Sequence, residues 1–554
     1  MSDDLKKKLK EVVRGEVDDS EGARRQASRD TSIFTRMPEL VVSPEDADDV
    51  SAIVKGVGHA REAGATISLA ARAAGTDMSG GPLTTGVVVS FTPHMNRVLE
   101  VGEDYAVTEP GVYYRDFEKA TLEKNLILPS YPASRGLCAM GGIVANNSGG
   151  ERTLEFGKTE NFVEELDVVL SDGSFATFKP LTEAEVNAKK LEHTLEAQIY
   201  RTMDAIITNN AELIEAKRPK VSKNSAGYAL WSIRDPKTGL FNLAKLICGS
   251  QGTLALWTKA KLKLIKPKEH RAMLVVFLYD LNVLPQIVER ILPFDPESFE
   301  SYDDHTFTLA VKLLPEMMSQ MGFGKAVRLG IDFIPEAAMV ATGGVPKMIL
   351  MAEFAEDTIE IADRKASFAQ DSLKGLHVHT KIEKDEKESE KYWIVRRESF
   401  ALLRKNLHGL YACPFIDDFV VPPSCYPTFL PKLNALLEEY KDHFIYTIAG
   451  HIGNGNFHII PLMDLSKEEN RQVVLDLAPK VYELVISVGG TTTGEHNDGI
   501  IRTPYLPMLF GDEMVALFEE TKKVFDPQHI LNPGKKVGGT FEDIKRDMIK
   551  TQEG

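Results

Sequence analysis

The first clear pattern along the chain is a β-α-β unit. The apolar run at residues 39–42 predicts a strand, and Ser43 is a good N-cap for a helix that follows it. The helix is expected to bury an apolar stripe, and residues 65–70 predict a second strand that leads into a loop of small residues, 72–81. The stripe consists of Val50, Ile53, Val54 and Val57.

Similar patterns divide the rest of the chain. Residues 1–36 are highly charged and predict a helical N-terminal arm. Pro267 and Lys268 mark a domain boundary, and the chain beyond them predicts a second α+β domain. The charged run 381–388 predicts a solvated helix or loop. Further strands are predicted at 86–90, 98–101, 105–108, 163–170, 258–265, 273–279 and 348–354, and helices at 114–125 and 181–220.

The stretch 450–458 predicts a β-hairpin that carries two histidines. Asn454-Gly455 is a strong signal for a type I′ turn, which would pair His451 directly with His458 on one face of the sheet. Two converging imidazoles form half of a metal site. The alternative is a hairpin with two surface histidines.

Four loops of small residues accompany these elements: 72–81, 141–150, 222–228 and 248–254. The first follows a strand and offers backbone N–H groups to an anion. Its Gly75 and Gly80 have P-loop spacing, but Gly81-Pro82 stands where Lys-Ser/Thr should be, and G-x-G-x-x-G is also absent. A Walker-type ATPase and a Rossmann dinucleotide site are therefore not supported, and a plain turn is the alternative. The first two loops together suggest one extended ligand with a diphosphate in its middle.

Composition narrows the function. The 554 residues, 43% of them hydrophobic, are enough for two or three domains, and the net charge of −16 argues against nucleic acid. No apolar run reaches the roughly 18 residues of a membrane span, and the N-terminus does not resemble a signal peptide. The four cysteines form no C-x-x-C pair, so no iron–sulfur motif is predicted. The expected location is the cytoplasm, with peripheral contact at the inner membrane face left open.

The order of the loops resembles a known family. Arg72-x-x-Gly75-Thr76-x-x-Ser79-Gly80-Gly81, the 141–150 loop and Gly249-Ser250-x-Gly252-Thr253-Leu254 together resemble the FAD-binding domain of the p-cresol methylhydroxylase/vanillyl-alcohol oxidase superfamily. Within it the chain looks like the group of D-lactate dehydrogenase, glycolate oxidase and D-2-hydroxyglutarate dehydrogenase. Ala73, Ala74 and Gln251 depart from the family pattern.

This resemblance implies an α+β fold with a two-subdomain FAD-binding domain and an α+β cap domain. The expected parts are an arm at 1–36, the FAD domain at 37–267, the substrate domain at 268–527 and a C-terminal segment, 528–554, that returns to the FAD domain. FAD is expected to be non-covalent because the 72–81 loop has no histidine or cysteine. The implied FAD-binding residues are Arg72, Ala74, Gly75, Thr76, Ser79, Gly80, Ser134, Gly141, Gly142, Ala145, Asn146, Asn147, Gly149, Gly150, Gly252, Thr253, Leu254 and Asn532.

The family's Trp-x-x-Arg helix stands here as Trp393 to Arg396, and the resemblance implies that Arg396 binds the substrate carboxylate. A surface salt-bridge arginine is the alternative. Relatives in the D-2-hydroxyglutarate group carry a lysine about 15 residues further on, whereas residues 414–422 contain none. A plain 2-hydroxy acid is therefore favoured over a diacid.

The family motifs Gly-His-x-Gly-Asp/Asn-Gly-Asn-x-His and Gly-Glu-His match 450–458 and 494–496. In relatives with a metal, His451, His458 and Glu495 would bind zinc or manganese, and His496 would be the catalytic base. Two histidines and one carboxylate leave coordination positions open for substrate. Asn497 replaces a common glycine.

The predicted function is therefore an FAD-dependent dehydrogenase that oxidises a D-lactate-like 2-hydroxy acid, with hydride transfer to flavin N5. The electron acceptor is left open among a quinone, a cytochrome, an electron-transfer flavoprotein and a separate iron–sulfur subunit, and a homodimer is allowed. Three alternatives remain: a metal-dependent hydrolase using the histidines and Glu495, a non-redox flavoprotein with ether-lipid chemistry, and a non-catalytic nucleotide-binding module.

Overall fold

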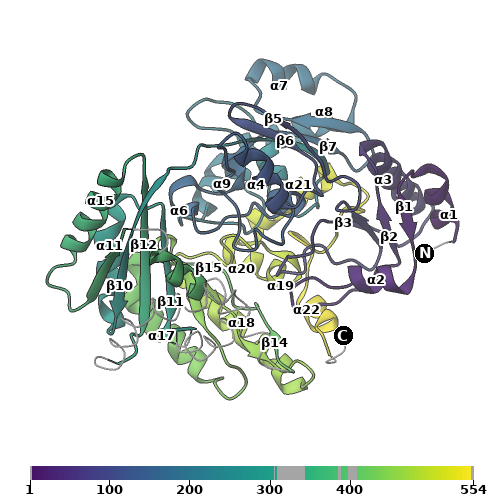
Figure 1. The fold of residues 1–554 in the computed structure, drawn as a ribbon. Helices are drawn as coiled ribbons and strands as arrows, with labels where there is room; N and C mark the ends of the chain where they lie inside the picture. The colour runs from purple at the N-terminus through teal and green to yellow at the C-terminus, as the bar shows by residue number, and fades with distance from the viewer. Residues whose placement is uncertain (1–2, 305, 308–343, 385–387, 397–408, 551–554) are drawn as a thin grey trace, which may run out of the picture.

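A computed structural model of the chain describes residues 3–304, 306–307, 344–384, 388–396 and 409–550. Two masses are visible in Figure 1. The N-terminal half forms one, and the green strands and helices of the later chain form the other. The yellow C-terminal segment runs back among the purple and blue elements.

The first sheet is built on the predicted β-α-β unit. Strands β2 (Leu40–Ser43), β4 (Val87–Ser90) and β3 (Leu69–Arg72) are parallel, and α3 (Ala47–Glu62) packs its predicted stripe into their core. The helix begins later than predicted because Asp46, not Ser43, accepts the N–H groups of Asp48 and Asp49. The predicted arm contains α1 (Asp3–Val12), β1 (Glu16–Asp18), which pairs with β2, and α2 (Glu21–Ala27).

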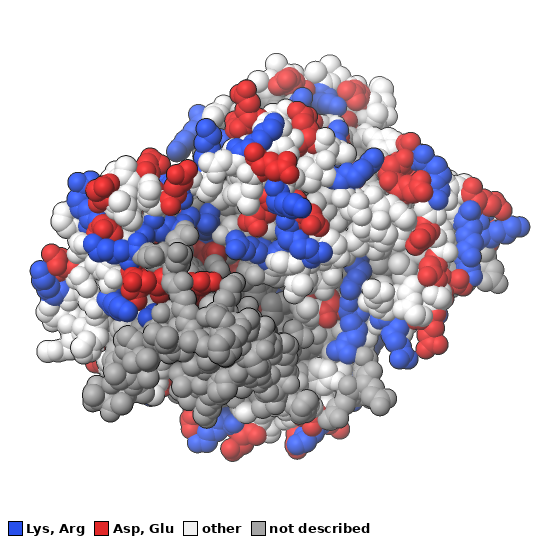
Figure 2. Space-filling model, in the orientation of Figure 1, with Lys and Arg blue, Asp and Glu red and all other residues white. Residues whose placement is uncertain are grey.

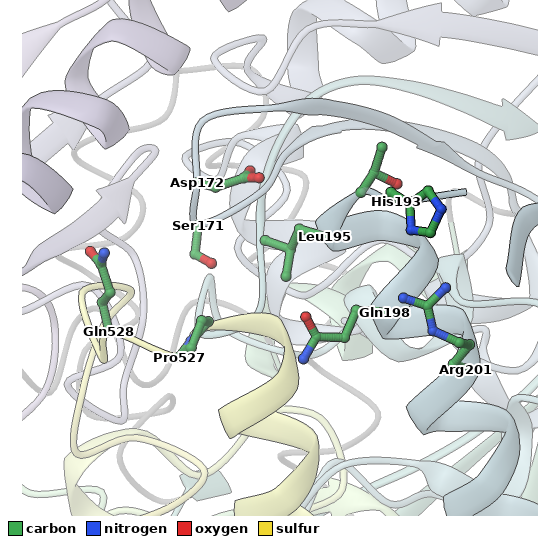
Figure 3. Close-up of a pocket in the computed structure, with 9 residues that line it drawn as sticks. Ser171, Asp172, His193, Leu195, Gln198, Arg201, Pro527 and Gln528 are labelled. Carbon is green, nitrogen blue, oxygen red and sulfur yellow. The ribbon is translucent and has the colours of Figure 1, made fainter. Parts of the chain in front are cut away.

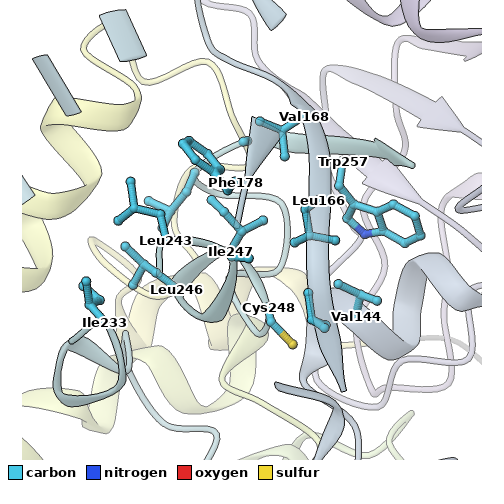
Figure 4. Packing of buried hydrophobic residues seen from close by; sticks show 14 of the residues in the cluster. Val144, Leu166, Val168, Phe178, Ile233, Leu243, Leu246, Ile247, Cys248 and Trp257 are labelled. Atoms are coloured by element: carbon cyan, nitrogen blue, oxygen red, sulfur yellow. The ribbon is translucent and has the colours of Figure 1, made fainter. Parts of the chain in front are cut away.

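The second sheet is antiparallel, and helices cover it. Its strand order is β5-β6-β9-β7-β8. Figure 4 shows its core, where Leu166 and Val168 of β7 meet Leu243, Leu246 and Ile247. The strands are β5 (Val98–Val101), β6 (Tyr105–Thr108), β7 (Val163–Val169), β8 (Phe175–Phe178) and β9 (Leu256–Lys263), and the helices are α4 (Tyr114–Leu122), α7 (Glu183–Lys190), α8 (Leu195–Asn209), α9 (Ala211–Lys217) and α10 (Ala244–Ile247).

The third sheet, here called the cap sheet, has seven antiparallel strands in the order β13-β10-β12-β11-β16-β17-β15. Helices α11 (Leu284–Ile291), α15 (Ile359–Ser372), α17 (Tyr426–Glu438) and α18 (Glu468–Ser487) share a core with one face. The other face carries Tyr302 and Met351, which share a second cluster with Trp393 of the helix at residues 388–396. The strands are β10 (His270–Leu278), β11 (Ser298–Asp303), β12 (Met348–Glu356), β13 (His379–Glu383), β15 (Phe419–Val420), β16 (Ile448–His451) and β17 (Asn456–Ile459), and β14 (Tyr411–Ala412) pairs separately with β18 (Leu462–Met463).

The predicted solvated run at 381–388 is wrong at its start. Residues 381–383 belong to β13, which pairs with β10 at the edge of the cap sheet. Ile382 contributes its apolar side chain to the core, so the charges on either side mark an edge strand rather than a free segment. Residues 385–387 of the run lie outside the described residues.

The chain after residue 498 returns to the first two sheets. Helix α21 (Asp512–Phe525) packs on α8, and Leu531 forms a parallel bridge with Leu69 of β3. Near the C-terminus, Met548 bridges Phe34. The predicted domain boundaries stay predictions. The remaining helices of this segment are α19 (Gly499–Arg502), α20 (Leu506–Phe510) and α22 (Phe541–Asp547).

Candidate active site between the glycine loops and the cap sheet

A cavity of about 480 Å³ lies where the glycine loops meet the cap sheet. Its walls come from the loop after β3, from α5 (Met140–Asn146), from residues 250–257 and from the hairpin β16–β17. Of the residues predicted to bind FAD, the following line it: Arg72, Ala74, Gly75, Thr76, Ser134, Gly141, Gly142, Ala145, Asn146, Gly149 and Gly252. All the predicted catalytic and metal residues also line it: Arg396, His451, His458, Glu495 and His496.

Only some of the backbone N–H groups of the loop 72–81 are available to bind a phosphate. The carboxylate of Asp77 accepts the N–H groups of Ser79 and Gly81 at 2.9 and 2.7 Å, so these two donors are already used. Within the described residues, the N–H groups of 73–76 have no protein acceptor. Gly75 has a φ of +71°, which favours glycine and turns the chain there. The open anion-binding part of the loop is therefore 73–76.

Helix α5 presents a bare backbone surface to the cavity. A Cβ on Gly142 would meet no protein atom within 4 Å, although the residue lines the cavity. A Cβ on neighbouring Gly141 would lie 2.8 Å from the Pro110 carbonyl oxygen, so that glycine serves packing instead. A surface without a side chain at Gly142 fits the close approach of a flat ring or a diphosphate, as FAD binding requires.

The other predicted FAD-binding residues lie behind the cavity wall. Asn532 donates from Nδ2 to the carbonyl oxygens of Gly81 and Gln251, and so ties the two loops together. Asn147 ends α5 in the left-handed region with φ +51°. The residues of the prediction that are not in the cavity lining are Ser79, Gly80, Asn147, Gly150, Thr253, Leu254 and Asn532.

The hairpin exists, but its predicted register is wrong. His451 pairs with Asn456, and His458 pairs with Ala449. The turn is longer than Asn454-Gly455 because residues 452–454 form a 3-10 turn that Gly455 closes with φ +71°. Since the register moves by two residues, both histidines keep the same face, and their ring centroids are 5.2 Å apart.

Three predicted metal ligands converge at this face. Glu495 Oε1 lies 3.2 Å from His451 Nε2 and 3.4 Å from His458 Nε2. Ligand atoms each about 2.1 Å from a zinc ion at tetrahedral angles would be about 3.4 Å apart. Among the described residues, the group whose ligand atoms all lie within 4.8 Å of one another is Asp418, His458, Glu495 and His496, and His451 adjoins this group through Glu495 Oε1. Imidazole and carboxylate donors of this kind suit a divalent cation such as zinc or manganese. His496 is a further neighbour, with Nε2 3.9 Å from the same oxygen.

Two buried carboxylates orient the histidines from behind. Glu300 Oε1 is 2.5 Å from His451 Nδ1, and Asp417 Oδ1 is 3.1 Å from His458 Nδ1. With Nδ1 held in this way, each Nε2 faces Glu495, as in carboxylate–histidine–metal arrangements. Burial alone would lower the pKa of His458, but Asp417 and Glu495 raise it to about 10. An incoming cation therefore has to displace a proton from this histidine.

Asp417 also serves the predicted base, because its Oδ2 lies 2.7 Å from His496 Nδ1. Burial lowers the pKa of His496, but Asp418 and Asp417 outweigh it, so the pKa is raised. Asp418 holds the backbone as well, since its Oδ2 accepts the N–H groups of Glu495 and His496 at 2.9 and 2.7 Å. Asn497 has a φ of +69°, a conformation that explains a glycine at this position in relatives and that asparagine tolerates.

Arg396 ends the described part of a helix at residues 388–396 and faces the cavity. Its Nε and one Nη lie 3.3 and 3.2 Å from Glu300 Oε2, so Glu300 links the arginine to His451. A guanidinium has five N–H donors, which leaves donors for a substrate carboxylate. Burial raises the pKa of Glu300, but His451 and Arg396 outweigh it, so the pKa is lowered.

Sequence reasoning missed Lys223, Glu300, Asp417 and Asp418. Lys223 lies in the unusual loop 222–228, and its Nζ is 3.1 Å from Glu495 Oε2. Asp417 and Asp418 lie in the stretch 414–422, which contains no lysine. An adjacent pair of acids between apolar residues was the available signal, because buried carboxylates need partners. Glu300 offered no such signal within its strand.

A second pocket of about 480 Å³ lies elsewhere, between Ser171, α8 and Pro527 (Figure 3). None of the predicted site residues lines it. Arg201 at its edge donates to the carbonyl oxygens of Lys190 and Glu192, which is a structural role.

The molecular surface carries both signs of charge. On the face in Figure 2, lysines and arginines intermingle with acidic residues over the described elements. Within the described part of the chain, no helix has the length and apolar character needed to cross a membrane.

Comparison with known proteins defines the class. Residues 38–179 match the model of an FAD binding domain, and residues 267–536 match the model of the C-terminal domain of FAD linked oxidases. The two matches together identify in this chain the FAD-binding domain and the C-terminal domain of the FAD linked oxidases. This confirms the predicted family and the predicted α+β fold class.

Particular relatives lie in the predicted group. The chain is 27% identical over 529 residues to D-2-hydroxyglutarate dehydrogenase from Pseudomonas putida, covering 94% of this chain and 50% of that protein. It is 28% identical to the glycolate oxidase protein GlcD of Bacillus subtilis, covering 96% of each, and 28% identical to D-lactate dehydrogenase from Archaeoglobus fulgidus, covering 90% of this chain and 91% of that one. The chain spans about half the length of the first of these relatives.

Solved structures share the fold. 4-Ethylphenol oxidase from Gulosibacter chungangensis superposes with a TM-score of 0.66 at 17% identity, over 97% of both chains. An alkyldihydroxyacetonephosphate synthase gives a TM-score of 0.65 at 15% identity, over 96% of this chain and 85% of that one. At these identities the likeness concerns the fold alone.

Proposed function

We propose that this protein is an FAD-dependent dehydrogenase that oxidises a D-2-hydroxy acid with one carboxylate to the 2-oxo acid. The observation that carries the proposal is the cavity itself. One end is formed by open loop N–H groups and the bare surface of Gly142, and the other by Arg396, His496 and the cluster around Glu495. Both ends open into one space, as hydride transfer to a flavin requires.

Each residue has a defined task. Arg396 binds the substrate carboxylate through guanidinium donors that Glu300 leaves available. His496 takes the proton of the 2-hydroxyl at Nε2, while Asp417 orients the ring through Nδ1. FAD, bound non-covalently, would supply the acceptor for the hydride of C2, and a zinc or manganese ion, which His451, His458 and Glu495 would hold, would lower the pKa of the hydroxyl. Oxidation removes one hydride and one proton, which balances the conversion to the 2-oxo acid.

Substrate size and charge follow from the cavity lining. Among the described residues after position 267 that line the cavity, Arg396 is the single lysine or arginine, and Thr306, Ala412, Thr447, Ala449 and Ile460 are uncharged. One cation matches one carboxylate, so a D-lactate-like acid is proposed. The second candidate is a diacid, as in the names of the D-2-hydroxyglutarate dehydrogenase relatives.

The test is flavin reduction in the absence of oxygen. Purified holoenzyme is mixed with D-lactate, L-lactate or D-2-hydroxyglutarate, and loss of flavin absorbance is followed. The proposal expects reduction to be fastest with D-lactate. Faster reduction by D-2-hydroxyglutarate would show that the substrate is a diacid. No reduction by any 2-hydroxy acid would refute the proposed dehydrogenase activity.

A further inference from the structure

A buried lysine divides the two oxygens of Glu495. The Lys223 side chain has no exposed surface, and its Nζ lies 3.1 Å from Glu495 Oε2 and 3.4 Å from Asn456 Oδ1. The other oxygen, Oε1, faces the Nε2 atoms of His451 and His458. An ammonium group therefore occupies one oxygen of the carboxylate, and the proposed metal position lies at the other.

The loop that carries Lys223 is fixed to the catalytic segment. Ser225 N donates to the carbonyl oxygen of Thr493 at 3.0 Å, and Gly227 N donates to Asp498 Oδ2 at 2.8 Å. Ser222 Oγ donates to the carbonyl oxygen of Asn454 in the hairpin turn at 2.7 Å. The loop 222–228 thus holds the ammonium in place from the side opposite the histidines.

We propose that Lys223 is a positioning residue that competes with the divalent cation for Glu495. It rests on the metal part of the proposed function. By holding Oε2, Lys223 limits Glu495 to one ligand oxygen and keeps coordination positions open for the hydroxyl and carboxylate of the substrate. Its positive charge also weakens binding of the ion, so the ion is held less tightly than the ligand set alone would allow.

Charge and burial together set the sign of the effect. Lys223 Nζ lies 3.1 Å from Glu495 Oε2, and the two side chains are 0% and 6% exposed, so the ammonium is a close, buried counter-charge of this carboxylate. Without the lysine, the buried carboxylate lacks this counter-charge until an ion binds. Removing the ammonium therefore destabilises the protein without a bound ion, because the carboxylate loses its counter-charge. It also stabilises the protein with a bound ion, because the repulsion between the two positive charges disappears. Both changes strengthen metal binding.

The experiment compares metal affinity in flavin-loaded proteins. Dissociation constants for Zn²⁺ and Mn²⁺ are measured by competition with a chelator for the wild type, Lys223→Met and Lys223→Gln at one pH. Both variants are expected to bind at least one ion about tenfold more tightly than the wild type. The glutamine variant keeps a donor without the charge and provides a second reading if the methionine variant does not fold.

Lys158→Met is the matched control. Lys158 is also buried and reaches the same loop, but its Nζ donates to Asn224 O, Ser225 Oγ and Gly494 O rather than to Glu495. This control is expected not to tighten metal binding, so tightening there would contradict a role specific to Lys223.

Equal or weaker metal binding in the Lys223 variants overturns the inference and leaves the proposed function standing. A wild type that binds neither ion overturns both the inference and the metal part of the proposed function. Flavin reduction by a 2-hydroxy acid, measured on the same preparations, separately tests the dehydrogenase activity.

Discussion

The three histidines of the site share two carboxylates behind them. Asp417 contacts both His458 and His496, so one side chain orients a proposed metal ligand and the proposed base. Glu300 joins His451 to Arg396 in the same way. The residues proposed for metal binding, proton transfer and carboxylate binding therefore share two orienting acids, Asp417 and Glu300.

The role of His496 can be tested by replacing it with alanine. Loss of the base is expected to slow flavin reduction by roughly 100-fold or more while FAD stays bound, because the ring lies at the substrate end of the cavity. Stopped-flow reduction of the bound flavin measures the rate. His59→Ala, an exposed histidine of α3, is the control and is expected to behave as the wild type. Unchanged reduction in His496→Ala would remove the base assignment.

The buried side chain of Asp30 is expected to make the free energy of unfolding depend on pH. Burial and the nearby Asp77 raise the pKa of Asp30 from 3.8 to about 8. The folded state therefore binds more protons than the unfolded state between these values, and the free energy of unfolding falls as pH rises through this window.

Asp30→Asn cannot ionise and should lose this dependence. At about pH 9 the free energy of unfolding of the variant is expected to exceed that of the wild type by about 1 kcal/mol or more. At about pH 5 this advantage of the variant is expected to be lost. Denaturant unfolding at both pH values measures the difference. An identical pH profile in the two proteins would show that Asp30 ionises normally.

Among the secondary-structure elements, the hairpin β16–β17 shows what the sequence can and cannot specify. Asn454-Gly455 correctly placed a turn with a strand on either side. The register was wrong because the turn recruits Ile452 and Gly453 into a 3-10 segment. That choice depends on packing outside the hairpin: a Cβ on Gly455 would lie 1.9 Å from the Val421 carbonyl oxygen of the neighbouring segment. Both histidines still lie on the same face of the sheet, because the predicted register differs from the observed one by two residues.

Helix α5 provides a test of cofactor binding. Gly142→Leu is expected to prevent FAD binding without unfolding the protein, because the new side chain would enter the cavity where no protein atom lies within 4 Å. Flavin content after purification and reconstitution, together with the melting temperature, measures this. Gly150→Leu is the contrast: a Cβ there would lie 2.2 Å from the Tyr131 carbonyl oxygen, so the fold itself should suffer. Full flavin content in Gly142→Leu would place FAD elsewhere.

The site residues that the sequence did not predict come from elements far apart along the chain. The β-α-β unit and most strands follow local patterns of polarity and glycine, and the predicted ligand residues follow the resemblance to the family motifs. Glu300, Lys223 and Asp417 are separated by scores of residues and meet only when β11, the loop 222–228 and the segment before β15 pack together. Local periodicity carries no information on such pairings, so the residues behind the ligands were missed.

In the whole molecule, the site is assembled at the meeting of its two masses. The first two sheets contribute the glycine loops and Lys223, and the cap sheet contributes Glu300 and the hairpin. The segment 493–498 then leads into α19 and the chain returns to β3, where Leu531 pairs with Leu69. The same continuous segment therefore carries Glu495 and His496 and ties the cap sheet to the FAD-binding part.

The most direct measurement is anaerobic mixing of the purified holoenzyme with D-lactate while flavin absorbance is followed. An FAD-dependent 2-hydroxy acid dehydrogenase predicts that the oxidised flavin band disappears, that pyruvate forms in equal amount, and that L-lactate acts far more slowly. A flavin that stays oxidised with every 2-hydroxy acid, or a protein that cannot be reconstituted with FAD, would contradict it.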